Sequence, residues 1–209
     1  MLSKLIITAA IALSSFITIA KPIAIDENNI SPLLNGHEIP NISLQTVEGE
    51  DVNLKELVSH KNTVLFFYRG GWCPFCNVQM GQLQAIESKL LAMNIQLVGI
   101  SPDSPEKLKA SITKNKLNYL LLSDEKMQAA QSFGLAFYTS DKVTKMYQAK
   151  LGVSNTLFNL PTGEARLVLP VPAIYMSDKT GLIQFMYANP NYKVRPAPEL
   201  ILSAARLLE

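Results

Sequence analysis

The sequence predicts an α/β fold in which a central mixed β-sheet is flanked by helices. Three observations support this prediction. Continuous β-branched and aromatic runs, typical of strands buried on both faces, occur at 63–68 and 95–100. Each run is followed by a helical pattern, at 74–91 and at 105–114. An amphipathic helix at 198–208, which follows a β-hairpin, closes the chain.

The first 20 residues have the composition of a signal peptide and are set aside before the fold is considered. Lys4 gives a positive start, residues 5–16 form an apolar run, and small residues stand at Thr18 and Ala20. The run is shorter than the roughly 20 residues that span a bilayer. We therefore expect an exported protein, periplasmic or secreted after cleavage near Ala20. The alternative is an uncleaved amino-terminal anchor, which would also place the domain outside the cytoplasm.

The remaining chain is predicted to form one domain with a short approach segment. A chain of 209 residues suits a single domain with additions. Residues 21–40 are proline-rich and are expected to be an extended lead-in, and the domain is expected to cover 41–209. Within it, 41–54 predicts a hairpin with its turn at Gly49, an amino-terminal extension of the sheet.

Other elements follow from the same patterns. The sequence predicts a helical turn at 55–60, a strand at 118–122, a helix opened by Asp124 and ending near Phe133, an inserted helix at 141–151, a strand at 167–176, a turn at 178–181 and its partner strand at 182–187.

Pro172 lies inside the predicted strand 167–176, where proline is disfavoured unless it has a special role. We expect a cis Val171–Pro172 bond, which would leave the backbone groups of Val171 free to pair with a substrate chain. A trans proline on an edge strand is the alternative.

Composition excludes one class of function. The chain has 19 basic and 17 acidic residues, a net charge of +2, and no dense basic run. A nucleic-acid partner therefore has no electrostatic support.

The two cysteines, Cys73 and Cys76, form a Cys-x-x-Cys motif. A disulfide across so short a loop constrains the unfolded chain very little, so a purely structural staple is a poor explanation. A structural zinc site needs four ligands, and only His37 and His60 remain as soft partners, neither at a spacing that points to the motif. We therefore expect redox chemistry, with no metal and no cofactor.

The position of the motif predicts different roles for its thiols. Pro74 fits the first turn of a helix, which places Cys73 at the helix N-terminus and Cys76 about one turn inside. Unpaired N–H groups and the helix dipole favour a thiolate at Cys73. Cys76 is more shielded and should stay protonated longer. Cys73 is thus expected to attack and Cys76 to resolve the product into a disulfide.

Residues beside the motif have two interpretations each. Trp72 either shields the thiols and offers a docking face, or belongs to the core. Arg69 either stabilises the thiolate or is a solvated charge at the end of a strand. Gly70 and Gly71 either make a turn or let a substrate approach the backbone.

Five stretches resemble the thioredoxin superfamily, and within it the peroxiredoxin-like branch of the alkyl hydroperoxide reductase and thiol-specific antioxidant proteins. They are ISLQTVEGEDVNLKEL, VLFFYRGGWCPFC, LVGISPDSPEKL, VPAIYMSDKTGLI and NPNYKVRP, and the likeness covers 41–209. It implies a thioredoxin-like fold, with Cys73 as the peroxide-attacking cysteine, Cys76 as a nearby resolving cysteine and Pro172 as the cis-proline.

The sequence departs from the family pattern at four positions. Typical peroxiredoxins place a proline and a threonine before the attacking cysteine, and an arginine on a late strand. Here Arg69 stands near the proline position, Gly70 where the threonine hydroxyl would be, and Pro172 at the place of the arginine. The buried acid that thioredoxin carries before its motif is matched by Phe67.

These features predict a thiol-dependent peroxidase that reduces hydrogen peroxide or organic hydroperoxides through a Cys73–Cys76 dithiol–disulfide cycle. An external dithiol, a thioredoxin-like protein or a small thiol, would restore the pair. The alternatives are an exported thiol–disulfide oxidoreductase that acts on protein disulfides, and a redox-sensing or thiol-based binding module. Tyr192 and Arg195 lie in the family-like tail, either near the active site or in a solvated loop.

The leader gives the first testable prediction. Amino-terminal sequencing of the mature protein should begin near Lys21, because the charge, apolar run and small residues match what a signal peptidase reads. An intact Met1 on a cytosolic protein would contradict export.

Overall fold

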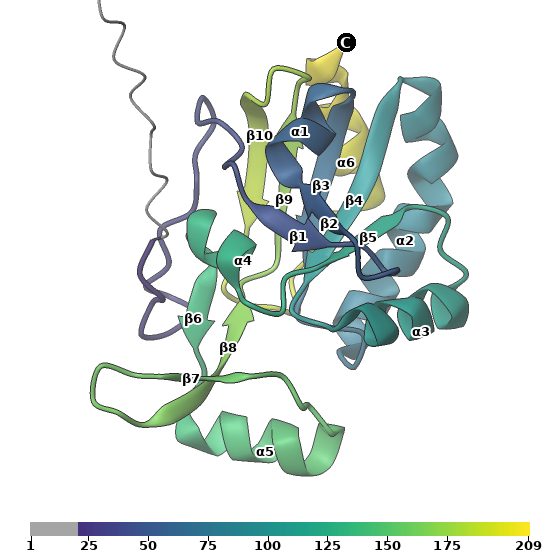
Figure 1. Ribbon diagram of the computed structural model, residues 1–209. Coiled ribbons are helices and arrows are strands. Elements are labelled where there is room, and N and C mark those ends of the chain that lie inside the picture. Colours follow the sequence, from purple (N-terminus) through teal and green to yellow (C-terminus); the bar gives the residue numbers. More distant parts are fainter. Residues whose placement is uncertain (1–20) are drawn as a thin grey trace, which may run out of the picture.

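The computed structural model describes residues 21–209 (Figure 1). The strands are β1 (Ser43–Gln45), β2 (Asp51–Asn53), β3 (Asn62–Phe67), β4 (Ile95–Ser101), β5 (Leu120–Ser123), β6 (Ala136–Tyr138), β7 (Leu157–Asn159), β8 (Ala165–Pro170), β9 (Ala173–Ser177) and β10 (Ile183–Ala188). The helices are α1 (Leu54–Ser59), α2 (Pro74–Ala92), α3 (Pro105–Asn115), α4 (Gln128–Ser132), α5 (Asp141–Leu151) and α6 (Pro198–Ala205), the last followed by a 3-10 turn at Arg206–Leu208.

A seven-stranded mixed sheet forms the centre of the molecule, in the order β10-β9-β3-β4-β5-β1-β2. Strands β3, β4 and β5 are parallel, whereas β9 runs antiparallel to both β3 and β10. The β1–β2 hairpin pairs antiparallel with β5 and extends the sheet. The predicted mixed α/β fold and its amino-terminal hairpin are therefore confirmed.

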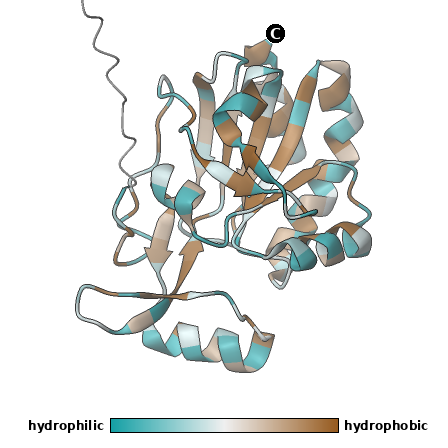
Figure 2. Cartoon of the chain, viewed as in Figure 1, coloured by the Kyte–Doolittle hydropathy of each residue, from teal (hydrophilic) through white to brown (hydrophobic). Residues whose placement is uncertain are grey.

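Strand β3 explains why the sheet carries a hydrophobic core on each face. Successive side chains of a strand point to opposite faces. Val64 and Phe66 pack into a cluster with residues of α2 and α6, while Leu65 and Phe67 pack into a second cluster with residues of α1 and α4. Figure 2 shows the result, with hydrophobic residues concentrated along the central strands and hydrophilic ones on the outer helices.

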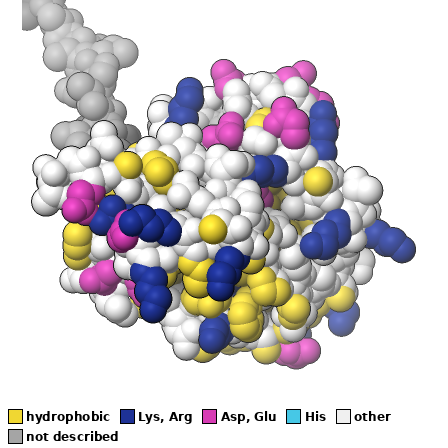
Figure 3. Space-filling view, turned by 90° about the horizontal axis from the view of Figure 1, so that it is seen from below, with side chains coloured by type: hydrophobic (Ala, Val, Ile, Leu, Met, Phe, Trp, Pro, Cys, Tyr) yellow, Lys and Arg dark blue, Asp and Glu magenta, His cyan; other side chains and the backbone are white. Residues whose placement is uncertain are grey.

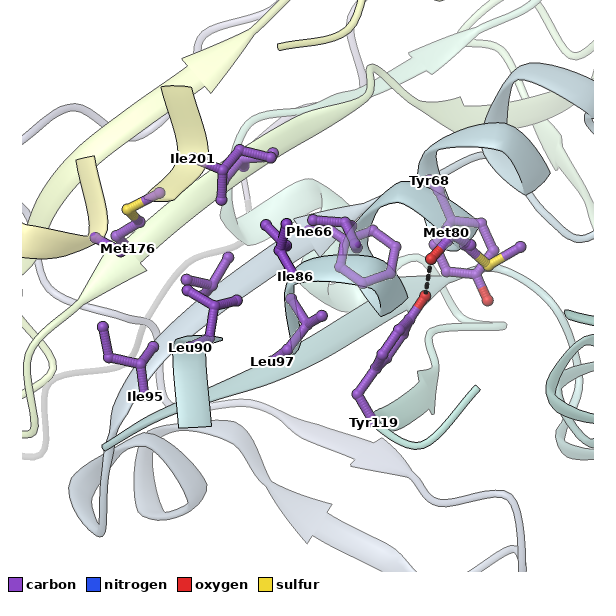
Figure 4. Packing of buried hydrophobic residues seen from close by; sticks show 14 of the residues in the cluster. Phe66, Tyr68, Met80, Ile86, Leu90, Ile95, Leu97, Tyr119, Met176 and Ile201 are labelled. Atoms are coloured by element: carbon purple, nitrogen blue, oxygen red, sulfur yellow. Dashed lines mark hydrogen bonds between the residues drawn. The ribbon is translucent and has the colours of Figure 1, made fainter. Parts of the chain in front are cut away.

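The cluster on the α2 side holds the helix that carries the cysteines. Met80, Ile86 and Leu90 of α2 pack against the sheet beside Phe66, as Figure 4 shows. The Tyr119 hydroxyl donates to the carbonyl oxygen of Met80 over 3.1 Å. Because these side chains are nearly inaccessible to water, the position of α2 is strongly constrained.

A smaller sheet with the order β6-β8-β7 lies below the central one in Figure 1, together with α5. The prediction of a single strand at 167–176 is wrong, because β8 ends at Pro170 and β9, in the other sheet, begins at Ala173. Pro172 has no N–H to donate to a strand ladder, so it suits the crossing between sheets better than a strand interior.

The expected cis bond before Pro172 is also wrong, since every peptide bond within residues 21–209 is trans. The Val171 N–H is not free for a substrate chain, because it donates to the carbonyl of Leu135 over 2.9 Å. The trans proline lies between two strands rather than on an edge strand.

Asp124 does not begin the helix predicted there, which starts at Gln128. Its carboxylate instead accepts hydrogen bonds from the N–H groups of Ala129 and Ala130, over 2.9 and 2.8 Å. Burial raises the pKa of Asp124 to about 7, while these N–H groups oppose the rise.

The lead-in 21–40 packs on the domain. Ala24 pairs with Phe137 of β6, and the side chains of Leu33 and Ile39 are buried in the second core cluster. The predicted signal peptide lies outside the described residues, so export stays a prediction. Within the described part of the chain, no helix combines the length and apolar character needed to cross a membrane.

Gly134 gives a prediction about stability. It has φ +69°, and a Cβ added there would lie 1.9 Å from the carbonyl oxygen of Ser31 in the lead-in. Gly134→Ala should lower the free energy of unfolding by roughly 2–4 kcal/mol, from backbone strain plus the clash. Gly163 (φ +90°) has open space around it, so Gly163→Ala should cost only about 1 kcal/mol. Equal losses in urea unfolding would show that the lead-in does not pack as described.

Candidate active site

The two cysteines lie where β3 leads into α2. Cys73 is the N-cap residue of α2, with Pro74 in the first turn, and the N–H groups of Cys76 and Asn77 each donate to the Cys73 carbonyl over 3.1 Å. The predicted placement of one cysteine at the helix terminus and one a turn inside is therefore what the structure has.

The loop before the motif depends on Gly70. Its φ is +138°, and a Cβ there would lie 2.4 Å from Trp72 Nε1 and 2.7 Å from Asp103 Oδ1. The other carboxylate oxygen of Asp103 accepts a 2.6 Å hydrogen bond from the N–H of Gly71. Burial raises the pKa of Asp103, and the Gly71 N–H opposes this. A side chain at position 70 would thus displace the indole and the carboxylate that shape the loop.

Both cysteines are free thiols and almost fully buried, with exposed fractions of 1% for Cys73 and 0% for Cys76. A hydrogen bond from the Cys76 thiol lowers the pKa of Cys73 to about 6, aided by the charges of Arg69 and Arg195 and opposed by burial. Burial and the neighbouring Cys73 raise the pKa of Cys76 well above its ordinary value. At neutral pH the pair therefore holds one thiolate, on Cys73, and one thiol.

Arg69 is buried, with 3% of its surface exposed, so it is not a solvated charge at the end of a strand. Its guanidinium carbon lies 5.1 Å from the ring centres of both Trp72 and Tyr147 and 4.1 Å from that of Tyr192. It donates to the Tyr147 hydroxyl over 2.7 Å. Within residues 21–209 no ion pair joins it to a carboxylate. Its charge is thus left to act on Cys73.

Arg195 connects the carboxyl-terminal loop to the dithiol. Its Nη2 donates to Cys76 Sγ over 3.5 Å, its Nη1 donates to Gln79 Oε1, and its Nε donates to the Tyr192 carbonyl over 2.9 Å. The Tyr192 ring lies edge-on to Phe75, 5.6 Å between centres. The loop is therefore part of the site, not a solvated segment.

The structure also places Trp72 and Pro172, the two other residues that the sequence analysis singled out. The Trp72 ring packs against that of Tyr147, with 5.1 Å between centres, and contacts the core cluster that contains the cysteines, so it belongs in part to the core. Its role as a docking face stays a prediction. Pro172 lines a cavity that Arg69 also lines.

Three residues of the site were missed by the sequence analysis. Gln79 lies one helical turn beyond Cys76 on the same face of α2, a spacing that could have indicated it. Asp103 follows β4, and parallel strands end at a common edge, which is a weaker signal. Tyr147 comes from α5, and nothing in its local sequence pointed to the motif.

A thiolate and a thiol at the start of a helix, on a mixed sheet flanked by helices, define a dithiol redox protein of thioredoxin-like fold. Comparison with known proteins narrows this class to one family. The AhpC/TSA family model matches residues 35–186. Peroxiredoxin Bcp of Escherichia coli is 36% identical over 106 residues, which is 51% of this chain and 67% of that protein. Chloroplastic peroxiredoxin Q of Sedum lineare is 30% identical over 177 residues, covering 84% of this chain and 80% of that protein.

Solved structures agree on the fold. Reduced Prx3 of Vibrio vulnificus, in complex with hydrogen peroxide, has a TM-score of 0.67 at 17% identity, covering 83% of this chain and 99% of that one. Peroxidoxin BcpB of Mycobacterium tuberculosis has a TM-score of 0.61 at 17% identity, covering 84% and 97%. The chain belongs to the AhpC/TSA family, in its peroxiredoxin branch, and is a thiol-dependent peroxidase.

The position of Arg69 predicts how the thiolate responds to pH. Because a nearby cation favours the thiolate, Arg69→Gln should raise the pKa of Cys73 by about 1 pH unit. Alkylation of Cys73 at pH 6.5 should then slow about threefold, with the difference narrowing at higher pH. A pH titration of the thiolate absorbance gives the pKa of Cys73 independently, as the midpoint of the curve.

Arg206→Gln is the matched control, since Arg206 is an exposed arginine near the carboxyl terminus. If the pKa of Cys73 is the same in Arg69→Gln as in the control, Arg69 does not act on the thiolate.

Proposed function

We propose that this peroxiredoxin reduces hydroperoxides with Cys73 as the attacking thiolate and Cys76 as the resolving thiol. The main support for this proposal is that the pKa values of the two cysteines change in opposite directions: that of Cys73 is lowered and that of Cys76 is raised. Only the thiolate is nucleophilic, so the difference supports Cys73 as the attacking sulfur.

The cycle follows from this assignment. The Cys73 thiolate attacks one oxygen of the peroxide; an S–O bond forms, the O–O bond breaks, and the other oxygen leaves as hydroxide or alkoxide and takes up a proton. Cys73 is then a sulfenic acid. Cys76 attacks its sulfur, an S–S bond forms, and the sulfenic oxygen leaves as water. An external dithiol reduces the disulfide and returns both thiols.

Arg69 and Arg195 supply the positive charge for the departing oxygen. The family positions that carry a threonine hydroxyl and a late-strand arginine are Gly70 and Pro172 here, and neither side chain can donate a hydrogen bond. Both guanidinium groups act electrostatically on Cys73, so they face the charge that develops when the O–O bond breaks. Arg69, which lines the same cavity as Pro172, thus supplies the charge that the family arginine would supply.

Burial of the thiols favours a peroxide over a protein disulfide as the oxidant. Cys73 has only 1% of its surface exposed, and the loop that carries Tyr192 and Arg195 contacts Cys76 and Arg69. A small peroxide needs little space, whereas a disulfide on a protein surface needs this loop to move. The disulfide oxidoreductase remains the second candidate, and its location outside the cytoplasm follows if the leader directs export, whether it is then cleaved or kept as an anchor.

Figure 3 shows hydrophobic side chains gathered in the lower centre of the drawn face, with separate Lys and Arg side chains around them rather than one continuous basic surface. This face therefore gives no electrostatic support to a nucleic-acid partner.

Single cysteine variants test the assignment. Cys73→Ser should abolish the reaction with peroxide, because the remaining thiol has a raised pKa. Cys76→Ser should react once and stop, and should accumulate sulfenic acid, which further peroxide converts to sulfinic acid. Mass spectrometry after a pulse of peroxide, with the parent protein as control, distinguishes these products.

Two results would change the proposal. If Cys76→Ser shows no oxidation at Cys73 under conditions that oxidise the parent, the order of attack is reversed. If sulfenic acid forms only in large peroxide excess while mixed disulfides with a protein form readily, the protein is a disulfide oxidoreductase.

A further inference from the structure

A cavity of about 280 Å³ lies beside Arg69, outside the central sheet. Its walls come from the lead-in, β6, α5 and the loop after β10. The lining residues on which the argument rests are Ile25, Asp26, Glu27, Arg69, Phe137 and Val143. The catalytic chemistry proposed above uses Arg69 but leaves this space unexplained.

Most of the wall is apolar, and two of its hydroxyl groups are already engaged. The Thr139 hydroxyl is bonded to the hydroxyl of Thr144 and donates to the Leu167 carbonyl, and the Ser140 hydroxyl accepts from the N–H of Val143. Apart from Arg69 and two carboxylates, aromatic and aliphatic side chains supply the rest. Such a wall binds an apolar body and does not demand hydrogen bonds from it.

Arg69 is the polar end of the cavity and its link to the thiolate. Its Nε is buried and has no hydrogen-bond partner in the described part of the chain, although the Tyr147 hydroxyl accepts from its Nη2. The guanidinium carbon lies 4.1 Å from the centre of the Tyr192 ring, which also lines the cavity. The Tyr192 carbonyl accepts a hydrogen bond from Arg195, whose Nη2 donates to Cys76 Sγ over 3.5 Å. Direct contacts therefore connect the polar end of the cavity to the dithiol.

Two carboxylates, Asp26 and Glu27, stand in the lead-in wall. Asp26 accepts hydrogen bonds from Asn28 and Asn29, which hold its carboxylate in place without neutralising it. An anionic ligand body would meet two negative charges there, whereas an uncharged one would not.

We propose that this cavity binds the organic body of a compact, uncharged hydroperoxide and discriminates against carboxylate-bearing ones, with the peroxide group directed toward Arg69 and Cys73. The proposal rests on the peroxidase function above. It assigns the substrate preference to Val143, Phe137 and Ile25, from elements outside the central sheet. Hydrogen peroxide has no organic body and so gains nothing from these walls.

Filling the cavity tests this assignment. Val143→Trp should lower the ratio of kcat/KM for cumene hydroperoxide to that for hydrogen peroxide by about tenfold or more, because the new ring occupies the space of the organic body. Met146→Trp is the matched control, since Met146 lies on the same helix, is exposed and is not in the wall. Its ratio should equal that of the parent.

A second variant keeps the test valid if Val143→Trp does not fold. Ile25 lines the cavity but is 63% exposed, so Ile25→Trp narrows the space with little risk to the fold. It should lower the same ratio about threefold or more. Thermal unfolding of each variant shows whether the fold is retained.

The carboxylates are tested with a charged substrate. The parent should use cumene hydroperoxide at least threefold better than the same compound carrying a ring carboxylate, measured at low salt. Asp26→Asn combined with Glu27→Gln should narrow that difference, and so should added salt.

The outcomes separate this proposal from the one on which it rests. A parent protein that consumes neither peroxide would overturn the peroxidase function itself. A parent that consumes both, with the same substrate ratio in the folded Val143 and Ile25 variants, would overturn the cavity assignment alone.

Discussion

The constraint on this site is the guanidinium of Arg69, which is buried and has no carboxylate paired with it among residues 21–209. A buried cation is costly unless other groups compensate its charge. Three aromatic rings and the Tyr147 hydroxyl partly compensate the charge of Arg69, and the thiolate of Cys73 adds to this electrostatically. The interaction is reciprocal: the cation favours the thiolate, and the thiolate stabilises the buried cation. Oxidation to a disulfide removes the negative charge, so the same interaction favours the reduced protein.

The fold was largely predictable because its signals are local. Val64 to Phe67 are buried on both sides of the sheet, and continuous apolar runs report this directly. The error at Pro172 has a different origin. A run that passes from one sheet to another keeps its apolar character throughout, since Leu169, Val171 and Ala173 are all buried. Hydrophobicity alone therefore does not show where one sheet ends and the next begins.

The residues of the site also differ in how far the sequence predicts them. Cys73, Cys76 and the charge beside them could be found because one short motif carries them. Tyr147 could not, since it reaches Arg69 from 78 positions along the chain and its helix has an ordinary amphipathic pattern. Arg195 lies between these cases, because only the family likeness of the tail suggested its place. Contacts between distant segments follow from packing, which local patterns do not encode.

The crossing at Val171 and Pro172 has a consequence for cooperativity. Only these two residues separate β8 from β9, and Val171 is fully buried and bonded to Leu135. A linker of two residues is too short to let one sheet open while the other stays closed. The small sheet and the central sheet should therefore open as one unit rather than as separate foldons, so that the cavity wall and the dithiol share a single local stability.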